Sequence, residues 1–196
     1  MDCVQENKKI FEEAFKKYGD DTRSCQWDKP MIMRYQELKK IAELSDSSII
    51  DIGCGLGGLY EYFVKDCGIK NLKYTGIDIV GGMVEVAKKK YPEARFLTQD
   101  IMQVPLQERY DYAFMCGVFN QGMTTEFMKQ MLSAVFAHCE KGMAFNFISS
   151  YVNFRDDARS YHNPQEIFNY CIENLSWKVD VHHHYEKCDV SVFVYR

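Results

Sequence analysis

The chain has 196 residues, 46% of them apolar, and a formal net charge of −4 at pH 7. This length suits one domain with a proper core, and the net charge argues against a broad electrostatic surface for nucleic acid or anionic lipid. No apolar run is long enough to span a membrane, and the charged, amphipathic start of the chain is unlike a signal peptide. The eight cysteines lack CxxC spacing. They favour reduced thiols, and the chain is predicted to be cytoplasmic.

Hydrophobic periodicity predicts that helices and strands alternate along the chain. Apolar residues first recur at helical spacing over residues 4–18 and 30–44. Short apolar runs then predict strands at 47–52, 73–79, 95–98, 110–116 and 143–148. Helical patterns follow these strands at 59–64, 83–91, 124–139 and 164–174, and Gly142 is interpreted as lying beyond the end of the third of these helices.

The last two segments, 177–184 and 189–195, alternate in polarity on either side of a polar turn and predict a β-hairpin. Strands that alternate with helices imply a mostly parallel sheet with helices on both faces. The expected fold class is therefore α/β, a doubly wound seven-stranded sheet with an antiparallel hairpin at its C-terminal end. One domain is expected over residues 1–196.

The segment IIDIGCGLGGLYEYF, residues 49–63, places four glycines within six residues between a predicted strand and a predicted helix. Its G-x-G-x-x-G pattern, from Gly53 to Gly58, also fits the dinucleotide loop of nicotinamide-dependent oxidoreductases. Glycine at such a place indicates that a ligand comes close to the backbone. The pattern alone does not say which ligand.

Three acids end or follow the predicted strands around this loop. Asp51 ends the strand before the loop, where a carboxylate suits an amino group or a cation better than a pyrophosphate. Asp78 ends the next strand, at the position expected for an acid that accepts hydrogen bonds from ribose hydroxyls. Asp100 follows the third strand. Ligands of such sheets bind outside the carboxyl ends of the strands, so these acids are expected around one site.

Together these motifs resemble the class I S-adenosylmethionine-dependent methyltransferases. The stretch DIGCGLG, residues 51–57, matches motif I of that family, and YDYAFMCGVFN, residues 110–120, matches motif IV. The resemblance implies a Rossmann-like sheet, S-adenosylmethionine as cofactor and S-adenosylhomocysteine as product. It implies that the cofactor is bound by Asp51, Gly53, Cys54, Gly55, Asp78, Ile79, Met83, Asp100, Ile101 and Met115.

A narrower resemblance concerns the segment ahead of motif I. Trp27 and Asp28, followed by Arg34 and Tyr35, resemble a pattern in small bacterial methyltransferases of unassigned substrate. It implies that Trp27 and Arg34 also bind the cofactor, with the Arg34 guanidinium on the cofactor carboxylate. The alternative is a solvated arginine on a helix. Residues 1–45 are expected to form helices that cover the cofactor site.

The acceptor side is predicted from loops. Residues 149–164 form a long polar and aromatic loop, interpreted as a substrate lid or as a plain surface excursion. Asn120 and Tyr151 are expected to bind the substrate, and His162 is the candidate general base. Two histidines on one strand face, His182 and His184, are weak grounds for a metal, so no metal site is predicted.

A methyltransferase acting on a small-molecule acceptor is the function that these features favour. The position after the fourth main strand reads CGVFN and lacks the Asn/Asp-Pro-Pro-Tyr/Phe motif of nucleobase and glutamine methylation. No nucleic-acid or membrane partner is expected. Two alternatives stay open, namely an NAD(P)-dependent oxidoreductase that uses the same glycine loop and a non-catalytic module that binds S-adenosylmethionine.

Overall fold

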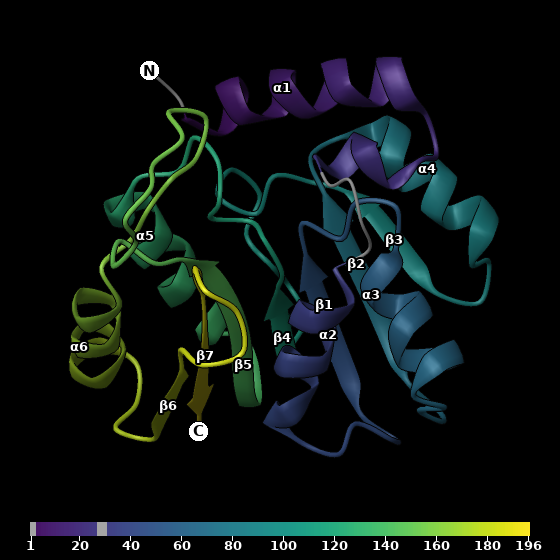
Figure 1. Cartoon of the computed structure of the whole chain (residues 1–196). Coiled ribbons are helices and arrows are strands. Elements are labelled where there is room, and N and C mark those ends of the chain that lie inside the picture. Colours follow the sequence, from purple (N-terminus) through teal and green to yellow (C-terminus); the bar gives the residue numbers. More distant parts are fainter. Residues whose placement is uncertain (1–2, 27–30) are drawn as a thin grey trace.

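The structure, a computed structural model, describes residues 3–26 and 31–196. Over these residues one seven-stranded sheet has the spatial order β3-β2-β1-β4-β5-β7-β6 (Figure 1). Its strands are β1 (Ser48–Ile52), β2 (Lys73–Asp78), β3 (Arg95–Thr98), β4 (Tyr110–Met115), β5 (Cys139–Ile148), β6 (Val179–His182) and β7 (Asp189–Tyr195). Neighbours are parallel from β3 to β5, and β7 is antiparallel to β5 and β6. The predicted fold class is confirmed.

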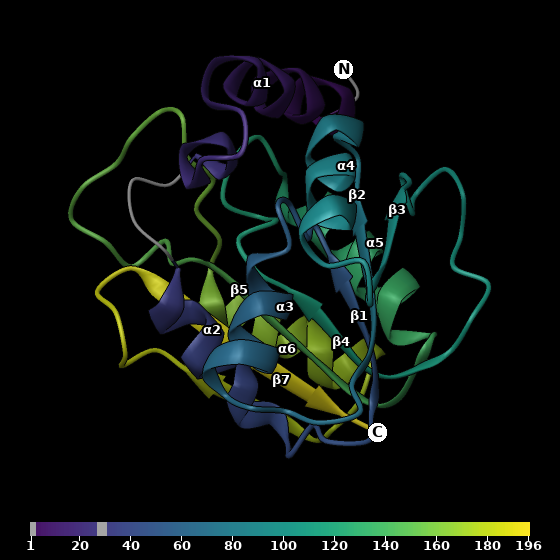
Figure 2. The same cartoon turned by 90° about the vertical axis from the view of Figure 1, so that its right-hand side faces the viewer.

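Helices cover both faces of the sheet (Figure 2). They are α1 (Cys3–Tyr18), η1 (Thr22–Cys25), α2 (Ile32–Leu38), η2 (Lys39–Ile41), α3 (Gly58–Glu61), η3 (Tyr62–Asp66), α4 (Gly81–Lys90), α5 (Thr125–Phe136) and α6 (Pro164–Asn174). The start of α5 is capped by Thr124, whose side chain accepts from the Phe127 N–H. Asn163 caps α6 in the same way, with Pro164 in the first turn.

Alternating residues of the strands feed two separate cores. In β1, Ile50 packs into the core beneath α5 and α6, whereas Ile49 packs into the core beneath α2, α3 and α4. Both side chains are fully buried, and burial of each contributes about 1.5–3 kcal/mol. Because both faces are covered, the central strands lose the polar alternation that would mark a solvated face. This explains why they read as short apolar runs.

Two predicted boundaries were wrong. The helix α5 ends at Phe136, and β5 begins at Cys139, four residues before the predicted strand. Gly142 therefore lies inside β5 rather than beyond a helix. A Cβ at Gly142 would lie 2.7 Å from the backbone oxygen of Val194, so the close approach of β7 requires glycine there. The predicted helix at 30–44 is represented, within the described residues, by α2 and η2.

The helix α1 lies across the carboxyl ends of the parallel strands (Figure 1). The Asn7 side chain donates to the Gln121 carbonyl in the loop after β4, and Phe15 packs against Gly82 at the start of α4. These contacts hold α1 over the edge of the sheet where ligands of doubly wound folds bind. Within residues 3–26 and 31–196, no helix combines the length and the apolar character needed to cross a membrane.

Candidate functional site

A cavity opens at the carboxyl ends of β1, β2 and β4, beneath α1. The strand order reverses between β1 and β4, so the cavity occupies the crevice where this fold class binds ligands. Its walls come from the N-terminal helices, the glycine loop, the ends of β2 and β3, the loop after β4 and Arg159. The predicted site residues that line it are Gly53, Gly55, Asp78, Ile79, Met83, Asp100, Ile101 and Asn120.

The glycine loop passes along the floor of the cavity. Gly53 and Gly55 have φ angles of 75° and 52°, in the left-handed region where side chains are strained. A Cβ at Gly53 would lie 2.7 Å from a methyl carbon of Val118, and one at Gly55 would lie 2.9 Å from the sulfur of Cys25. The loop thus needs glycine both for its turn and for the close packing of these two side chains.

Asp78 joins the end of β2 to the glycine loop. One carboxylate oxygen accepts from the Gly55 N–H at 2.8 Å, and the other accepts from the Val80 N–H at 2.8 Å. Burial raises the pKa of Asp78, and the backbone N–H groups of Val80 and Gly55 oppose that rise. The carboxylate lies in the cavity wall, as the sequence predicted.

Asp100 lines the cavity, and one of its carboxylate oxygens lacks a hydrogen-bond partner among the described residues. Its Oδ1 accepts from the Met102 N–H at 3.0 Å. Its Oδ2 is buried and has no hydrogen-bond partner among the described residues. An orphaned carboxylate oxygen is costly, so a ligand donor such as an amino group fits there. Ile79, Met83 and Ile101 supply apolar surface to the same cavity.

Asp51 is buried beside Tyr74 and does not line the cavity. The Tyr74 hydroxyl donates to Asp51 Oδ2 at 2.6 Å. Burial raises the pKa of Asp51 to about 7, a rise that the Tyr74 hydrogen bond opposes and the charge of Asp78 increases. The carboxylate is therefore poised to change its protonation near neutral pH. Its predicted contact with the cofactor stays a prediction.

Three further cofactor predictions fall away from the cavity wall or outside the described residues. Cys54 is buried behind the loop, where its Cβ approaches Gly76 of β2. Met115 is fully buried in the core beneath α5 and α6. Both side chains therefore pack rather than face the cavity. Trp27 lies outside the described residues.

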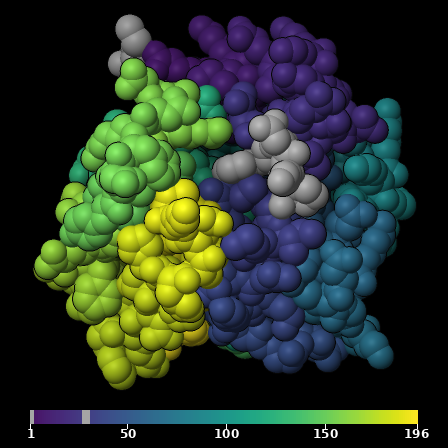
Figure 3. All heavy atoms as spheres, viewed as in Figure 1, coloured from purple at the N-terminus to yellow at the C-terminus, as the bar shows by residue number. Residues whose placement is uncertain are grey.

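Arg34 has a protein partner that the sequence did not reveal. Its guanidinium forms a two-point ion pair with Asp189 at the start of β7, with Nη2 and Oδ1 2.7 Å apart. Both side chains are buried, and Arg34 is absent from the cavity wall. This corrects both expectations, because the guanidinium is neither solvated nor directed at the cavity. Figure 3 shows the consequence, in which the yellow C-terminal hairpin packs directly beside α2.

A second polar contact joins α2 to β6, the other strand of the hairpin. His182 Nδ1 of β6 lies 2.5 Å from Glu37 Oε1 of α2, and Lys40 Nζ lies 2.6 Å from the other carboxylate oxygen of Glu37. Burial would raise the pKa of Glu37, but its bonds to Lys40 and His182 outweigh burial and lower it. His182 thus bonds to a side chain of α2. In the described part of the chain, no cluster of three or more His, Cys, Asp or Glu could hold a metal.

The loop after β4 carries the predicted substrate residue Asn120. This side chain is 1% exposed and lines the cavity. Neither its Oδ1 nor its Nδ2 has a hydrogen-bond partner within the described residues. The backbone of the loop is well anchored, because the Asn120 carbonyl accepts from the Ser160 N–H at 3.0 Å and the Gly117 N–H donates to Asn146 Oδ1 at 2.8 Å.

His162 is a structural bridge in this geometry. Its Nε2 lies 2.9 Å from the Phe119 carbonyl, and its Nδ1 lies 3.0 Å from the Thr125 hydroxyl. The ring is 1% exposed and absent from the cavity wall. Burial lowers its pKa, while the bond to Phe119 opposes that change. With both nitrogens engaged, the structure does not support His162 as the general base.

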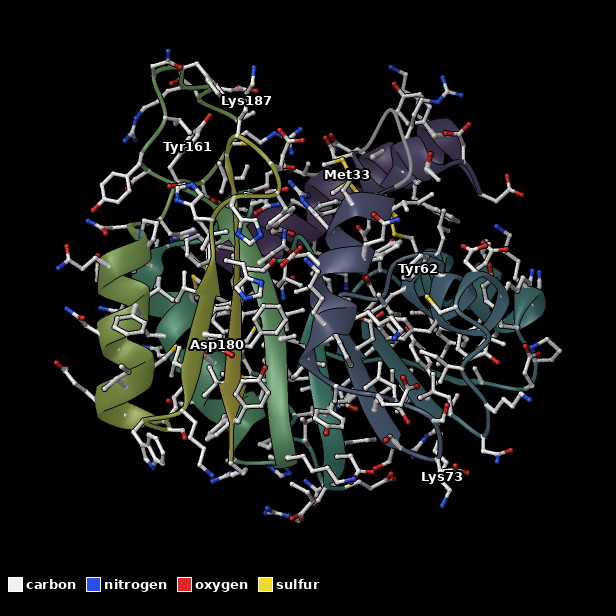
Figure 4. All side chains as sticks on the ribbon, turned by 60° about the horizontal axis from the view of Figure 1, so that its bottom comes forward. Met33, Tyr62, Lys73, Tyr161, Asp180 and Lys187 are labelled. Carbon is white, nitrogen blue, oxygen red and sulfur yellow. The ribbon has the colours of Figure 1, made fainter. Side chains whose placement is uncertain are left out.

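The predicted lid is a loop with a closed base. Ser149 and His162 form a parallel bridge, the Ser150 N–H donates to the His162 carbonyl at 2.8 Å, and the His162 N–H donates to the Ile148 carbonyl at 2.9 Å. Tyr151 is 59% exposed and lies outside the cavity, so the geometry does not favour it as a substrate residue. Figure 4 shows Tyr161 of this loop near the same edge as Met33 of α2 and Lys187 of the C-terminal hairpin, opposite Lys73 at the start of β2.

Several cavity residues escaped the sequence reasoning. Val4, Asn7 and Phe11 of α1 line the roof, and Val118 and Arg159 come from the loops after β4 and β5. The amphipathic pattern of α1 shows that one face is buried, but not that this face covers a site. Arg159 is one of several polar residues of the long loop at 149–164. No local signal marks it as closer to the cavity than its neighbour Arg155.

Comparisons with known proteins agree with this geometry. A family model described as a methyltransferase domain matches residues 49–142. The chain is 31% identical over 156 residues to the putative methyltransferase Rv1506c of Mycobacterium tuberculosis, which covers 75% of this chain and 92% of that protein. The structure of magnesium protoporphyrin IX methyltransferase from Synechocystis PCC 6803 with bound SAM has a TM-score of 0.72 at 17% identity, covering 100% of this chain and 98% of the other. A DhpI-SAM-HEP complex reaches 0.75 at 10% identity, covering 100% and 99%.

Proposed function

The chain belongs to the class I S-adenosylmethionine-dependent methyltransferases, and from this premise we propose that it methylates a small-molecule acceptor at the cavity beneath α1. The observation that carries the proposal is the pair of acids on the cavity wall, Asp78 and Asp100, on either side of an apolar surface. One acid is anchored to the glycine loop, and the other keeps a buried oxygen without a protein partner.

These residues fit the adenosyl part of the cofactor. Asp78 would accept hydrogen bonds from the ribose hydroxyls, and Asp100 Oδ2 would accept from the adenine amino group. Ile79, Met83 and Ile101 would pack against the base. Gly53 and Gly55 would let the amino-acid end approach the backbone, and Asp51, behind the loop, would favour its ammonium group electrostatically.

When bound, S-adenosylmethionine would supply an electrophilic methyl group: an acceptor atom would bond to the methyl carbon as the carbon–sulfur bond breaks with its electron pair left on sulfur, and a hydroxyl or ammonium acceptor would release one proton. The protein's part is to hold the two molecules in line and to keep water out. The roof formed by Val4, Asn7 and Phe11 of α1 suits that role, as does the loop at residues 149–164. We propose that residues 1–45 cover the site and that residues 149–164 act as a lid.

A small molecule is favoured as acceptor because the cavity is enclosed between α1 and the strand ends. The named relatives and structural neighbours include a protein that acts on magnesium protoporphyrin IX. The acidic composition of the chain supports the expectation of no nucleic-acid partner, and its eight free thiols support the expected cytoplasmic location.

The first test is titration of the purified protein with S-adenosylmethionine, S-adenosylhomocysteine and NADH by calorimetry. We expect the two adenosyl ligands to bind and NADH not to bind. A thermal-shift assay gives an independent reading, since a ligand at a hundredfold excess over its Kd adds about 2.7 kcal/mol of stability. Binding of NADH alone would contradict the proposal and favour an oxidoreductase.

The second test separates an enzyme from a binding module. Protein and S-adenosylmethionine labelled in the methyl group are incubated with a pool of small metabolites, and the label is followed into new compounds. We expect transfer to at least one of them. Adenosyl binding without transfer to any metabolite, nucleic acid or protein fraction would indicate a module that binds the cofactor without catalysis.

A further inference from the structure

Among the polar residues of the cavity wall that the cofactor assignment does not use, Asn120 and Arg159 come from the loops after β4 and β5. Asn120 presents an amide whose oxygen and nitrogen both lack partners in the described part of the chain. Arg159 lines the same cavity. The acids that line the cavity, Asp78 and Asp100, belong to the ends of β2 and β3.

The Asn120 amide is buried in the cavity wall and does not lie on the outer surface of the protein. Its side chain is 1% exposed, so the missing hydrogen bonds are not replaced by bulk water. A buried amide without partners is destabilising, and its presence in a cavity wall indicates that a ligand supplies them. Because an amide both donates and accepts, the matching ligand has an acceptor group and a donor group close together.

The backbone next to Arg159 is bonded to the loop that carries Asn120. The adjacent residue, Ser160, donates its N–H to the Asn120 carbonyl at 3.0 Å and accepts from the Met123 N–H through its hydroxyl at 3.0 Å. Two residues further on, His162 ties the loop to the Phe119 carbonyl and to Thr125. These bonds hold the backbone beside Arg159 against the backbone of the Asn120 loop, so both residues are carried by segments that are joined without a ligand.

We infer that the acceptor is a small organic anion that also carries a hydroxyl or amino group. The anionic group is held by the Arg159 guanidinium and the Asn120 Nδ2–H, and the hydroxyl or amine donates to Asn120 Oδ1, which orients it for methylation. Guanidinium groups bind carboxylate and phosphate oxygens in the same planar geometry, so either can be the anion. This inference rests on the proposed function and adds the substrate class to it.

The test uses the chemistry of the labelled product. The protein is incubated with methyl-labelled S-adenosylmethionine and a small-molecule cell extract, and the products are passed over an anion-exchange resin at pH 8 and then treated with mild alkali. We expect the labelled product to be retained by the resin and to survive alkali, because the methyl group has gone to a hydroxyl or amine and the anionic group remains. A phosphatase step before the resin distinguishes a phosphate from a carboxylate.

Two results would overturn the inference while leaving the methyltransferase proposal intact. Label confined to compounds that the resin does not retain would show that no anion is needed. Label released by alkali as methanol would show that the anion is the methylated atom and not the group that Arg159 holds. Absence of label from every compound would instead count against the proposed function itself.

Variants of the same loop assign the contacts. Arg159→Gln should lower transfer at limiting extract by about tenfold or more, with the Kd for S-adenosylmethionine changed by less than about twofold. Arg155→Gln is the matched control, because Arg155 stacks on Tyr161 with its guanidinium carbon 5.1 Å from the ring centre, is exposed and does not line the cavity. It should behave as wild type. A large loss of cofactor affinity in Arg159→Gln would assign the guanidinium to the cofactor carboxylate and contradict the inference.

Asn120 is tested by two replacements. Asn120→Asp keeps the size of the side chain but adds a negative charge, and it should raise the KM of the anionic acceptor by about tenfold or more. Asn120→Leu removes both hydrogen-bonding atoms and should lower kcat more than it changes the Kd for S-adenosylmethionine. Unchanged transfer in both variants would remove Asn120 from the acceptor site.

Discussion

Arg34 of α2 and Asp189 of β7 lie 155 residues apart in the sequence and form a buried, two-point ion pair. With the His182–Glu37 pair it fastens α2 to the C-terminal hairpin. Tyr35 of the same helix packs against Gly58 of the glycine loop, where a Cβ would lie 2.7 Å from the tyrosine oxygen. The hairpin therefore helps to position a helix that contacts the glycine loop.

Asp189→Asn should lower the free energy of unfolding by about 3–5 kcal/mol, because it leaves the buried Arg34 charge without a carboxylate. The measurement is urea unfolding followed by circular dichroism. Glu140→Gln is the matched control, since it breaks the exposed pair with Arg109 and should cost less than about 1 kcal/mol. Equal effects of the two changes would show that burial does not decide the strength of the Arg34 pair.

Asp78→Ala should weaken binding of S-adenosylmethionine by at least about tenfold, because in the proposed function the carboxylate accepts from the ribose hydroxyls, and it also accepts from the Gly55 N–H. Calorimetry measures the change. Asp46→Ala is the control, since the Asp46 side chain accepts from Asn71 on an exposed surface away from the cavity. Wild-type affinity in the Asp78 variant would remove this residue from the cofactor site.

In the protein without ligand, Asp51 should make the free energy of unfolding depend on pH. Burial raises its pKa from 3.8 to about 7, so the folded state binds a proton more tightly than the unfolded state. Its effect on stability is therefore most favourable below pH 4 and is lost as the pH rises towards 7. One unit of pKa corresponds to about 1.4 kcal/mol, so the change over this range is on the order of 4 kcal/mol.

The check compares wild type with Asp51→Asn, which keeps an oxygen for the Tyr74 hydroxyl but does not titrate. The stability of the variant relative to wild type should increase between pH 4 and pH 7, as measured by urea unfolding at several pH values. A difference that does not change with pH would mean that the folded and unfolded pKa values of Asp51 are alike.

His162→Gln should lower stability and leave the pH profile of turnover in place. Burial lowers the pKa of His162, so its contribution to stability is complete above the ordinary histidine value and falls as the pH drops below it. Loss of two buried hydrogen bonds should cost about 1–3 kcal/mol. A variant of wild-type stability that loses the alkaline or acidic limb of the kcat profile would restore His162 as the general base.

The sequence predicted those parts of the site that depend on local pattern. Asp78 ends β2, Asp100 follows β3, and the glycines between β1 and α3 are a contiguous motif, so their meeting at one edge follows from the order of the strands. The partner of Arg34 could not be predicted, because its ion pair depends on how the hairpin returns to the sheet. His162 was misread for a similar reason, since its two contacts come from the loop after β4 and from α5.

The fold shows the same division. In β5 the buried Cys139 is followed by two exposed polar residues, Glu140 and Lys141, so the first residues of the strand do not read as an apolar run. The sequence pattern predicts that Gly142 follows the end of a helix, whereas in the structure glycine is needed there because the antiparallel strand β7 packs against it. Hydrophobic periodicity predicts which side chains of a segment are buried. It says little about which backbone approaches from elsewhere.

The bridge between Ser149 and His162 has a consequence for how such a protein can change. Everything between these two residues projects from a base that is already closed, so a longer or different tip adds little loop-closure entropy and leaves the sheet untouched. Within residues 150–161, Arg159 lines the cavity and Ser160 bonds to the loop after β4, whereas the stretch 151–158 makes neither contact. If the proposed function holds, changes in this stretch are a route to new acceptor preferences that leaves the sheet and the glycine loop unchanged.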